Sequence, residues 1–193
     1  MTATFPEIEL PRGNLLLIGT GSIMVSVLPA WVMVLRDRYG WNITGCVTRT
    51  AAELVRPAAL AAACGRPVIG PGWDAGTGEV VHRWAAEWAD LVLAAPATNN
   101  FLAKCAHGFS DDVASATVAF TEAPVVLAPA LGRRLLSAPA TERNLALLAG
   151  DGRALVPTTT GRAAFNGAAE PGMMPDLPAV LDVVAKAVRS NAA

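Results

Sequence analysis

The chain has 193 residues, a length that suits one domain of ordinary size with a single substantial core. Its formal net charge is -1, from 15 basic and 16 acidic residues without a run of like charges, so its charge does not predict binding to nucleic acid or to an anionic membrane. Hydrophobic residues make up 53% of the chain and charged residues only 16%, which predicts that extra surface is buried between identical subunits. We therefore expect a homo-oligomer that binds small molecules or peptides.

Signals for export and for metal binding are missing from the sequence. The first residues, MTATFPEIELPRG, lack the basic start and apolar core of a signal peptide, and the strongest apolar stretch, from Ile23 to Leu35, is too short to span a bilayer. Cys46, Cys64 and Cys105 are odd in number and form no CxxC pair, so neither a disulfide framework nor a zinc site is predicted. We expect a cytoplasmic protein with cysteines in its core and no membrane partner.

Short apolar runs alternate with longer helix-like segments along the chain. Strands are expected at Asn14–Gly19, Trp41–Val47, Asp90–Ala95, Pro124–Ala128 and Ala154–Pro157. Helices are expected at Ile23–Tyr39, Thr50–Cys64, Glu79–Trp88, Asn99–Ala106, Asp111–Phe120, Glu142–Leu148 and Leu177–Arg189. The apolar runs are continuous, which is typical of strands covered on both faces. The sequence therefore predicts an α/β fold of three layers, Rossmann-like or flavodoxin-like, in which helices flank a parallel sheet and functional loops follow the strands.

We interpret residues 1–193 as one domain that begins with a short N-terminal tail over residues 1–12. Residues 158–175, TTTGRAAFNGAAEPGMMP, are rich in glycine, proline and small side chains, and we expect them to form a mobile loop. Long loops beside a sheet often close over a substrate, so this segment is a candidate substrate loop.

The first expected strand ends in Gly19-Thr-Gly21-Ser22, and a long helix follows directly. A glycine turn before a helix offers backbone N–H groups and the positive end of the helix dipole to a phosphate, and Ser22 adds a hydroxyl. The third glycine of a dinucleotide fingerprint is absent, because Met24 stands there, and no acidic residue ends the second strand. The pattern favours a mononucleotide phosphate, with a purely structural turn as the alternative.

The third expected strand is followed by APATNN at residues 95–100 and, after a helix, by AHGFSDD at residues 106–112. These segments resemble the homo-oligomeric flavin-containing cysteine decarboxylases. That family includes phosphopantothenoylcysteine decarboxylase and the enzymes that oxidatively decarboxylate C-terminal cysteines of ribosomal peptides. The segments GTGSI, VTRTAAEL and PALGRRLLSAPATERNLALL are similar to further parts of the family in the same order. The resemblance therefore extends from residue 12 to residue 175.

The resemblance implies a flavoprotein that binds FMN, with FAD less favoured, between the subunits of a homotrimer that in some members assembles into a dodecamer. By position, Gly21, Ser22 and Thr50 would contact the flavin phosphate. Thr98 and Asn100 would lie beside the phosphate and the ring. The same loops also contain Gly19, Thr48, Pro96 and Ala97. Hydroxyls, amides and backbone N–H groups suit a phosphate and the polar edge of a flavin.

His82 lies six residues before the segment Trp-Ala-Asp-Leu that opens the third strand, and in type and spacing it resembles the catalytic histidine of the family. The alternative is that His82 is a structural residue, as a lone histidine in a helix commonly is. The second histidine, His107, is interpreted as packing or forming a local hydrogen bond. An imidazole that titrates near neutrality suits removal of a thiol proton. The resemblance implies that the flavin accepts hydride from the cysteine β-carbon, and that the resulting thioaldehyde loses CO2 to give an enethiol.

Gly132 stands where the family motif PxMNxxMW has the asparagine that holds the substrate carboxylate and amide. We hypothesise that Arg133 or Arg134 binds the carboxylate instead, because a guanidinium binds it in a bidentate way. The alternative is that both arginines face solvent on a helix. Asn166, in the glycine-rich segment, is a further candidate substrate contact. That segment contains no cysteine, so the final reduction performed by the coenzyme A enzyme is not expected.

The sequence thus predicts a flavin-dependent cysteine decarboxylase that acts on the C-terminal cysteine of a ribosomally made precursor peptide. Its enethiol product would serve thioether formation of the aminovinyl-cysteine type, as in lanthipeptides. One alternative is phosphopantothenoylcysteine decarboxylase of coenzyme A synthesis, although we expect a chain ending at Ala193 to lack a fused synthetase domain. A flavin-binding regulatory or structural subunit without activity and a related flavin prenyltransferase are the others.

Overall fold

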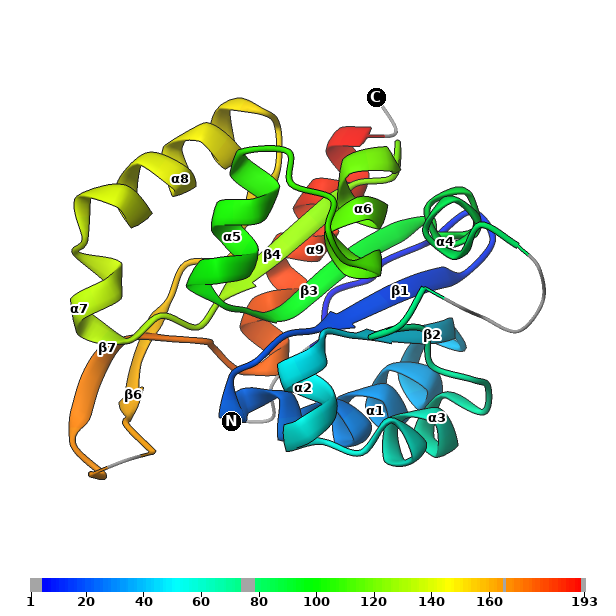
Figure 1. The fold of residues 1–193 in the computed structure, drawn as a ribbon. Coiled ribbons are helices and arrows are strands. Elements are labelled where there is room, and N and C mark those ends of the chain that lie inside the picture. Colours follow the sequence, from blue (N-terminus) through cyan, green and yellow to red (C-terminus); the bar gives the residue numbers. More distant parts are fainter. Residues whose placement is uncertain (1–4, 74–78, 165, 192–193) are drawn as a thin grey trace.

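The structure is a computed structural model that describes residues 5–73, 79–164 and 166–191. Its strands are β1 (Asn14–Gly19), β2 (Asn42–Val47), β3 (Leu91–Ala97), β4 (Val125–Pro129), β5 (Ala154–Leu155), β6 (Thr159–Arg162) and β7 (Ala169–Met173). Its helices are the 3-10 helix η1 (Ile23–Val27) and α1 (Leu28–Tyr39), α2 (Arg49–Leu54), α3 (Pro57–Cys64), α4 (Val81–Trp88), α5 (Asn99–Ala106), α6 (Val113–Phe120), α7 (Gly132–Leu136), α8 (Pro139–Gly150) and α9 (Leu177–Asn191). The expected three-layer α/β fold is confirmed (Figure 1).

The strand order places a topological switch point at the carboxyl ends of the strands. Five parallel strands form the main sheet in the order β2-β1-β3-β4-β5. The first two strands extend the sheet in one direction, and β3, β4 and β5 extend it in the other. At such a switch point the segments after two neighbouring strands leave toward opposite faces, and ligands bind between them. Here the switch point lies between β1 and β3.

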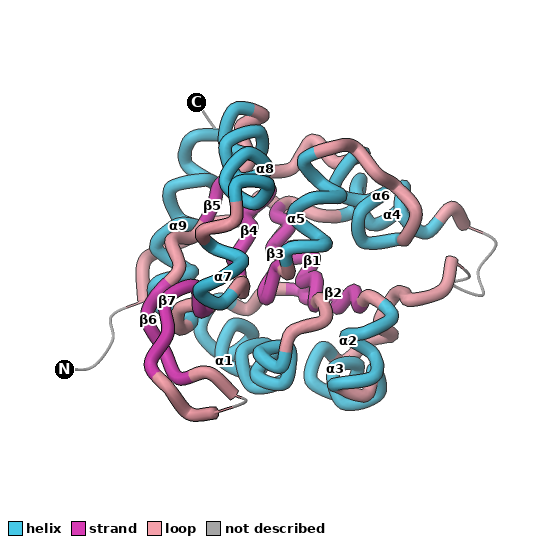
Figure 2. The backbone as a smooth tube through the Cα atoms, turned by 60° about the vertical axis from the view of Figure 1, so that its left-hand side comes forward, coloured by secondary structure: helices cyan, strands magenta, loops and turns pink. Residues whose placement is uncertain are grey.

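Two apolar cores cover the two faces of the sheet. Leu15 and Leu17 of β1 pack with α1, α3 and α9, while Leu16 and Ile18 pack with α4, α5 and α6. Figure 2 shows α1 and α3 on one side of the strands and α4, α5 and α6 on the other. Burial on both faces explains the continuously apolar strands. Among the described residues, none of the helices is long and apolar enough to cross a bilayer.

Prolines divide two of the expected helices. The helix expected at Ile23–Tyr39 begins as η1 and becomes α1 at Leu28, with Pro29 in its first turn. Proline is tolerated there because the N–H that it lacks would have no partner within the helix. The helix expected at Thr50–Cys64 is separated into α2 and α3, since the residue before Pro57 takes an extended conformation.

Residues 158–175, which we expect to be a mobile loop, contain a hairpin in which β6 and β7 pair antiparallel. Pro171 and Gly172 weaken the strand pattern in the sequence, because both residues are disfavoured inside strands. The hairpin lies outside the main sheet and packs against α7 instead, where the Leu131 N–H donates to the Gly172 carbonyl at 2.8 Å. This contact holds the hairpin beside the carboxyl end of β4.

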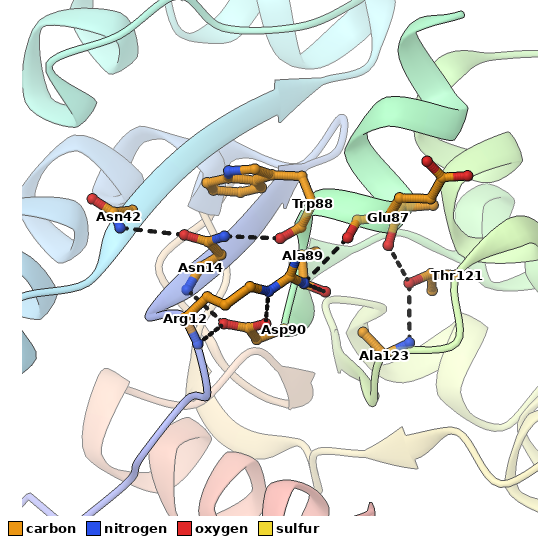
Figure 3. Close-up of polar contacts among 10 residues, drawn as sticks. Arg12, Asn14, Asn42, Glu87, Trp88, Ala89, Asp90, Thr121 and Ala123 are labelled. Carbon is orange, nitrogen blue, oxygen red and sulfur yellow. Dashed lines mark hydrogen bonds and ion pairs between the residues drawn. The ribbon is translucent and has the colours of Figure 1, made fainter.

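A polar network closes the amino end of the sheet (Figure 3). The Arg12 Nε donates to Asp90 at 2.8 Å, and the same carboxylate accepts from the backbone N–H of Arg12 at 2.7 Å and of Asn14 at 3.0 Å. The Asn14 amide donates to the Trp88 carbonyl at 3.0 Å and accepts from Asn42 at 3.2 Å. Residues 5–12 of the expected N-terminal tail lack regular structure, and Arg12 at their end belongs to this network. Residues 1–4 lie outside the described residues.

Candidate functional site

Hydrogen bonds join the three loops that follow β1, β2 and β3. The Thr20 hydroxyl donates to the Pro96 carbonyl at 2.7 Å and accepts from the Thr98 N–H at 3.0 Å, which connects the first loop to the third. The Thr48 N–H donates to the Gly19 carbonyl at 3.1 Å and connects the second loop to the first. Sequence reasoning missed Thr20, because a threonine between two glycines carries no local sign of a partner 76 residues away.

The joined loops have the donor set that a phosphate needs. A Cβ on Gly21 would lie 2.7 Å from the Thr50 Cβ, so only glycine allows these two loops to approach so closely. Ser22 and Thr98 cap the starts of η1 and α5, where their side chains accept from backbone N–H groups at 3.4 Å and their own hydroxyl hydrogens remain to donate. Hydroxyls beside helix starts fit a phosphate monoester.

The other residues expected at the cofactor lie at the same edge of the sheet. Ala97 is buried, and its carbonyl accepts from the Ala130 N–H at 3.0 Å, which connects the ends of β3 and β4. Asn100 is exposed in the first turn of α5. Its neighbour Asn99 accepts a hydrogen bond from the Thr141 hydroxyl at 2.9 Å, which attaches α5 to α8.

A groove of about 910 Å³ extends from η1 between α7 and the β6-β7 hairpin. Ser22 lies at the η1 end of the groove, and Arg133 and Arg134 line it from α7. The hairpin adds Arg162 and Glu170, which sequence reasoning did not identify. The remaining walls are mostly apolar. The structure therefore brings a residue of the expected phosphate loop and the two candidate substrate arginines to one groove.

Gly132 begins α7 in a conformation that few residues adopt. Its φ of 69° lies in the left-handed region, which glycine enters freely and asparagine tolerates better than most residues. A Cβ on Gly172 would lie 2.9 Å from the Gly132 backbone, so Gly172 allows β7 to touch the start of α7. The missing side chain at position 132 leaves room in front of Glu170, whose Oε2 is 3.9 Å from the position of a Cβ there.

The candidate substrate residues differ in what their side chains already bind. Arg133 and Arg134 are exposed, and within the described residues neither guanidinium forms an ion pair with a carboxylate. Both can therefore bind an anion in the groove. Asn166 lies in the hairpin turn, where its Oδ1 accepts from the Ala168 N–H at 2.9 Å, and it is not among the residues lining the groove.

His82 lies across the molecule from the groove, because α4 is far from α7 and β7 in both views (Figures 1 and 2). Its half-buried ring contacts Trp73 and Phe120 edge to face, with centroid distances of 5.5 Å and 6.2 Å. A single chain therefore does not bring His82 to the groove. The other histidine, His107, has its Nε2 3.0 Å from the Asn144 Oδ1, so its hydrogen bond joins the end of α5 to α8 and is not local in the sequence.

The cysteines are unsuited to nucleophilic chemistry. Burial raises the pKa of Cys46 and Cys64, and it raises the pKa of Cys105 to about 12. Thiols with such pKa values stay protonated at neutral pH and act as small apolar side chains.

Comparison with known proteins assigns the family. Residues 6–189 match the family described as Flavoprotein. The coenzyme A biosynthesis bifunctional protein CoaBC of Escherichia coli strain K12 is 34% identical over 176 residues, which cover 89% of this chain and 42% of the relative. CoaBC of Bacillus subtilis strain 168 is 33% identical over 149 residues, 77% of this chain and 36% of the relative. The chain thus spans less than half the length of these curated relatives.

Solved structures agree with this assignment. The FMN-dependent cysteine decarboxylase SpaF is 32% identical, with a TM-score of 0.80 over 93% of this chain and 97% of SpaF. A PPC decarboxylase bound to pantothenoylaminoethenethiol is 22% identical, with a TM-score of 0.76 over 92% of this chain and 96% of that chain, and shares the fold. Sequence, fold and donor set lead to one conclusion: the chain belongs to the flavoprotein family, in the branch of the flavin-containing cysteine decarboxylases.

Proposed function

We propose that this chain is an FMN-dependent enzyme that oxidatively decarboxylates the C-terminal cysteine of a ribosomally made peptide. The observation that carries the proposal is the single groove that joins Ser22 of the phosphate loop to Arg133 and Arg134. The similarity to the FMN-dependent cysteine decarboxylase SpaF supports it. The product is an enethiol for thioether formation of the aminovinyl-cysteine type, and the place of reaction is the cytoplasm, where such peptides are made.

FMN is the cofactor that this chemistry requires, and the donor set of the joined loops fits its phosphate. Ser22, Thr50 and Thr98 would hold the phosphate through hydroxyls and nearby backbone N–H groups, and Asn100 would contact the ring. When bound, FMN supplies a two-electron oxidant for the cysteine side chain. The close approach of Gly21 to Thr50 keeps the hydroxyl-bearing loops together.

Two groups of this chain act on the substrate. Arg133 or Arg134 binds the carboxylate through a charge-assisted, bidentate hydrogen bond and holds it until it leaves as CO2. His82 removes the thiol proton, which suits an imidazole at neutral pH.

The distance of His82 from the groove requires more than one subunit. In this proposal a neighbouring copy supplies the histidine, so each site lies between subunits. The resemblance to the family favours a homotrimer as this assembly, with a dodecamer as its larger form. The surroundings of His82 support this arrangement, because Trp73 and Phe120 beside it are 46% and 47% exposed in the isolated chain. Apolar rings of this size are commonly covered in an interface.

The decisive experiment combines an absorption spectrum of the purified protein with mass spectrometry of incubated peptides. A yellow protein should convert a peptide ending in cysteine to a product that has lost CO2 and two hydrogen atoms, and leave the same peptide ending in serine unchanged. A colourless protein that fails to bind added FMN would contradict the proposal.

Arginine variants test the role of the groove. Arg133→Ala or Arg134→Ala should lower kcat/KM at least about tenfold, because one charge-assisted hydrogen bond contributes roughly 1.5–3 kcal/mol. Arg143→Ala on the exposed side of α8 is the matched control and should retain activity. Unchanged turnover in both single variants would exclude the arginines as the carboxylate site.

A second candidate function is decarboxylation of phosphopantothenoylcysteine. The similarity to CoaBC favours it, and the three arginines of the groove suit a substrate that carries both a phosphate and a carboxylate. Residues 158–175 contain no cysteine, which disfavours the reduction that coenzyme A synthesis needs. Incubation with phosphopantothenoylcysteine distinguishes the two functions. A protein that binds flavin and leaves both substrates unchanged would instead be a regulatory or structural subunit.

A further inference from the structure

Glu170 is the acidic side chain of the groove, among the lining residues that the structure describes. It extends from β7, is half-buried, and places its Oε2 3.9 Å from the position of a Cβ on Gly132. No basic side chain of the described residues forms an ion pair with it. A carboxylate partly withdrawn from water gains stability from a hydrogen-bond donor. A ligand in the groove can supply that donor.

The backbone fixes Glu170 relative to the arginines. The Leu131 N–H donates to the Gly172 carbonyl at 2.8 Å, and Gly172 lies directly against the Gly132 backbone. Arg133 follows Gly132 in the chain, and Glu170 faces the space that Gly132 leaves open. An acceptor and an adjacent cationic donor are thus held on the two elements that meet at this glycine, so their spacing does not depend on a flexible loop.

This pair of charges matches one feature of an N-acylated cysteine. Its α-carbon carries a carboxylate, which needs a donor, and an amide N–H, which needs an acceptor. We propose that Glu170 determines specificity by accepting a hydrogen bond from the amide N–H of the terminal cysteine while Arg133 or Arg134 binds its carboxylate. The inference rests on the proposed function and defines the substrate class as peptides whose last amide nitrogen carries a hydrogen.

The test removes either partner of this hydrogen bond from FMN-loaded protein. The probes are the peptides Ala-Ala-Ala-Cys with and without an N-methyl group on the last amide. For the wild type, N-methylation should lower kcat/KM at least about tenfold, because a site built around a hydrogen bond rejects the ligand that lacks it. Glu170→Ala should lower kcat/KM for the unmethylated peptide similarly, and N-methylation should then cost little more. Glu170→Gln keeps an acceptor and should fall in between.

The control variant is Glu142→Ala, which removes an exposed carboxylate on α8 outside the groove. It should show the full N-methyl effect of the wild type. An N-methyl effect of equal size in wild type and Glu170→Ala would overturn the role of Glu170 while leaving the decarboxylase activity established.

Binding measurements separate this inference from the proposed activity. The same two peptides with serine in place of cysteine cannot react through a thiol, so calorimetry reports their affinity alone. A Glu170-dependent N-methyl effect on affinity, in a protein that does not convert cysteine peptides, would support the role of Glu170 and overturn the proposed reaction. A wild type that binds neither serine peptide would overturn the inference.

Discussion

Charged side chains are paired at the amino end of the parallel sheet and, within the described residues, unpaired in the groove at its carboxyl end. At the amino end, the Asp90 side chain is 4% exposed and accepts hydrogen bonds from Arg12 and from two backbone N–H groups. At the carboxyl end, Arg133, Arg134 and Glu170 line a groove and form no ion pair within the described residues. The paired charges fix the positions of strands, and the unpaired charges remain available to a ligand. Partners, and not residue types, thus distinguish the charges that stabilise the fold from those that can bind a ligand.

The largest expected effect is the loss of decarboxylase activity when His82, which lies outside the groove, is replaced. His82→Asn should lower CO2 release from cysteine peptides about a hundredfold or more, the usual contribution of a general base. Flavin binding should be unchanged, because α4, which carries His82, lies far from the carboxyl ends of β1 and β3 in Figure 1. His107→Gln, a change at the other histidine of the chain, is the control and should retain activity.

Mixed assemblies sharpen this test. His82→Asn alone should have only residual activity, and so should the double variant that combines Arg133→Ala with Arg134→Ala. If each site combines two copies of the chain, the two variants refolded together should recover part of the activity, because some sites then combine intact arginines from one subunit with an intact histidine from another. Full activity in His82→Asn alone would mean that the groove is sufficient by itself.

The next largest effect is on stability at the amino end. Asp90→Ala leaves the N–H groups of Arg12 and Asn14 without their acceptor, so we expect a loss of about 2–3 kcal/mol in the free energy of unfolding, measured with urea. Glu87→Ala removes the partner of Arg83 in an exposed pair at 2.8 Å and should cost less than about 0.5 kcal/mol. Equal losses in the two variants would contradict the structural role assigned to Asp90.

The fold follows from local patterns to a large extent. Continuous apolar runs such as Asn14–Gly19 alternate with helix-like segments, and together these two patterns predict a parallel sheet covered by helices on both faces. The hairpin at Thr159–Arg162 and Ala169–Met173 is not predictable in this way. Its strands contain glycine and proline and gain their stability from contact with α7, which no short sequence pattern records.

The residues of the candidate site also fall into two groups: those that a short sequence motif identifies and those that only the folded structure reveals. Gly21, Ser22 and Thr98 belong to short motifs whose chemistry is visible in the sequence, and the structure joins their loops. Glu170 is visible only after the hairpin packs against Gly132. The relation of His82 to the groove lies beyond a single chain. Local motifs therefore predict the loops that the structure joins, while tertiary contacts determine which residues line the groove.

A smaller effect is expected from separating the two loops that meet at Gly21 and Thr50. Gly21→Ala would place a Cβ 2.7 Å from the Thr50 Cβ, so the loops must separate and one hydroxyl contact to the phosphate is lost. We expect FMN affinity, measured by fluorescence titration of the flavin-free protein, to fall about tenfold. Gly150→Ala at the end of α8, where a Cβ meets open space, is the control. Unchanged affinity in Gly21→Ala would place the phosphate elsewhere.

The smallest expected effect is the pH dependence of the amino-end network. Burial raises the pKa of Asp90, but hydrogen bonds from Asn14 and Arg12 outweigh it, so the net pKa lies below the ordinary value of 3.8. A carboxyl group with a lowered folded pKa contributes stability above its unfolded pKa and loses that contribution as the pH falls through the folded pKa. The difference in unfolding free energy between wild type and Asp90→Asn should therefore be constant near neutral pH and shrink below about pH 4. Subtraction of the two urea series at each pH removes the effect of carboxylates common to both proteins. A difference that stays constant through the acid range would show that shape and hydrogen bonding, without the charge of Asp90, hold the amino end together.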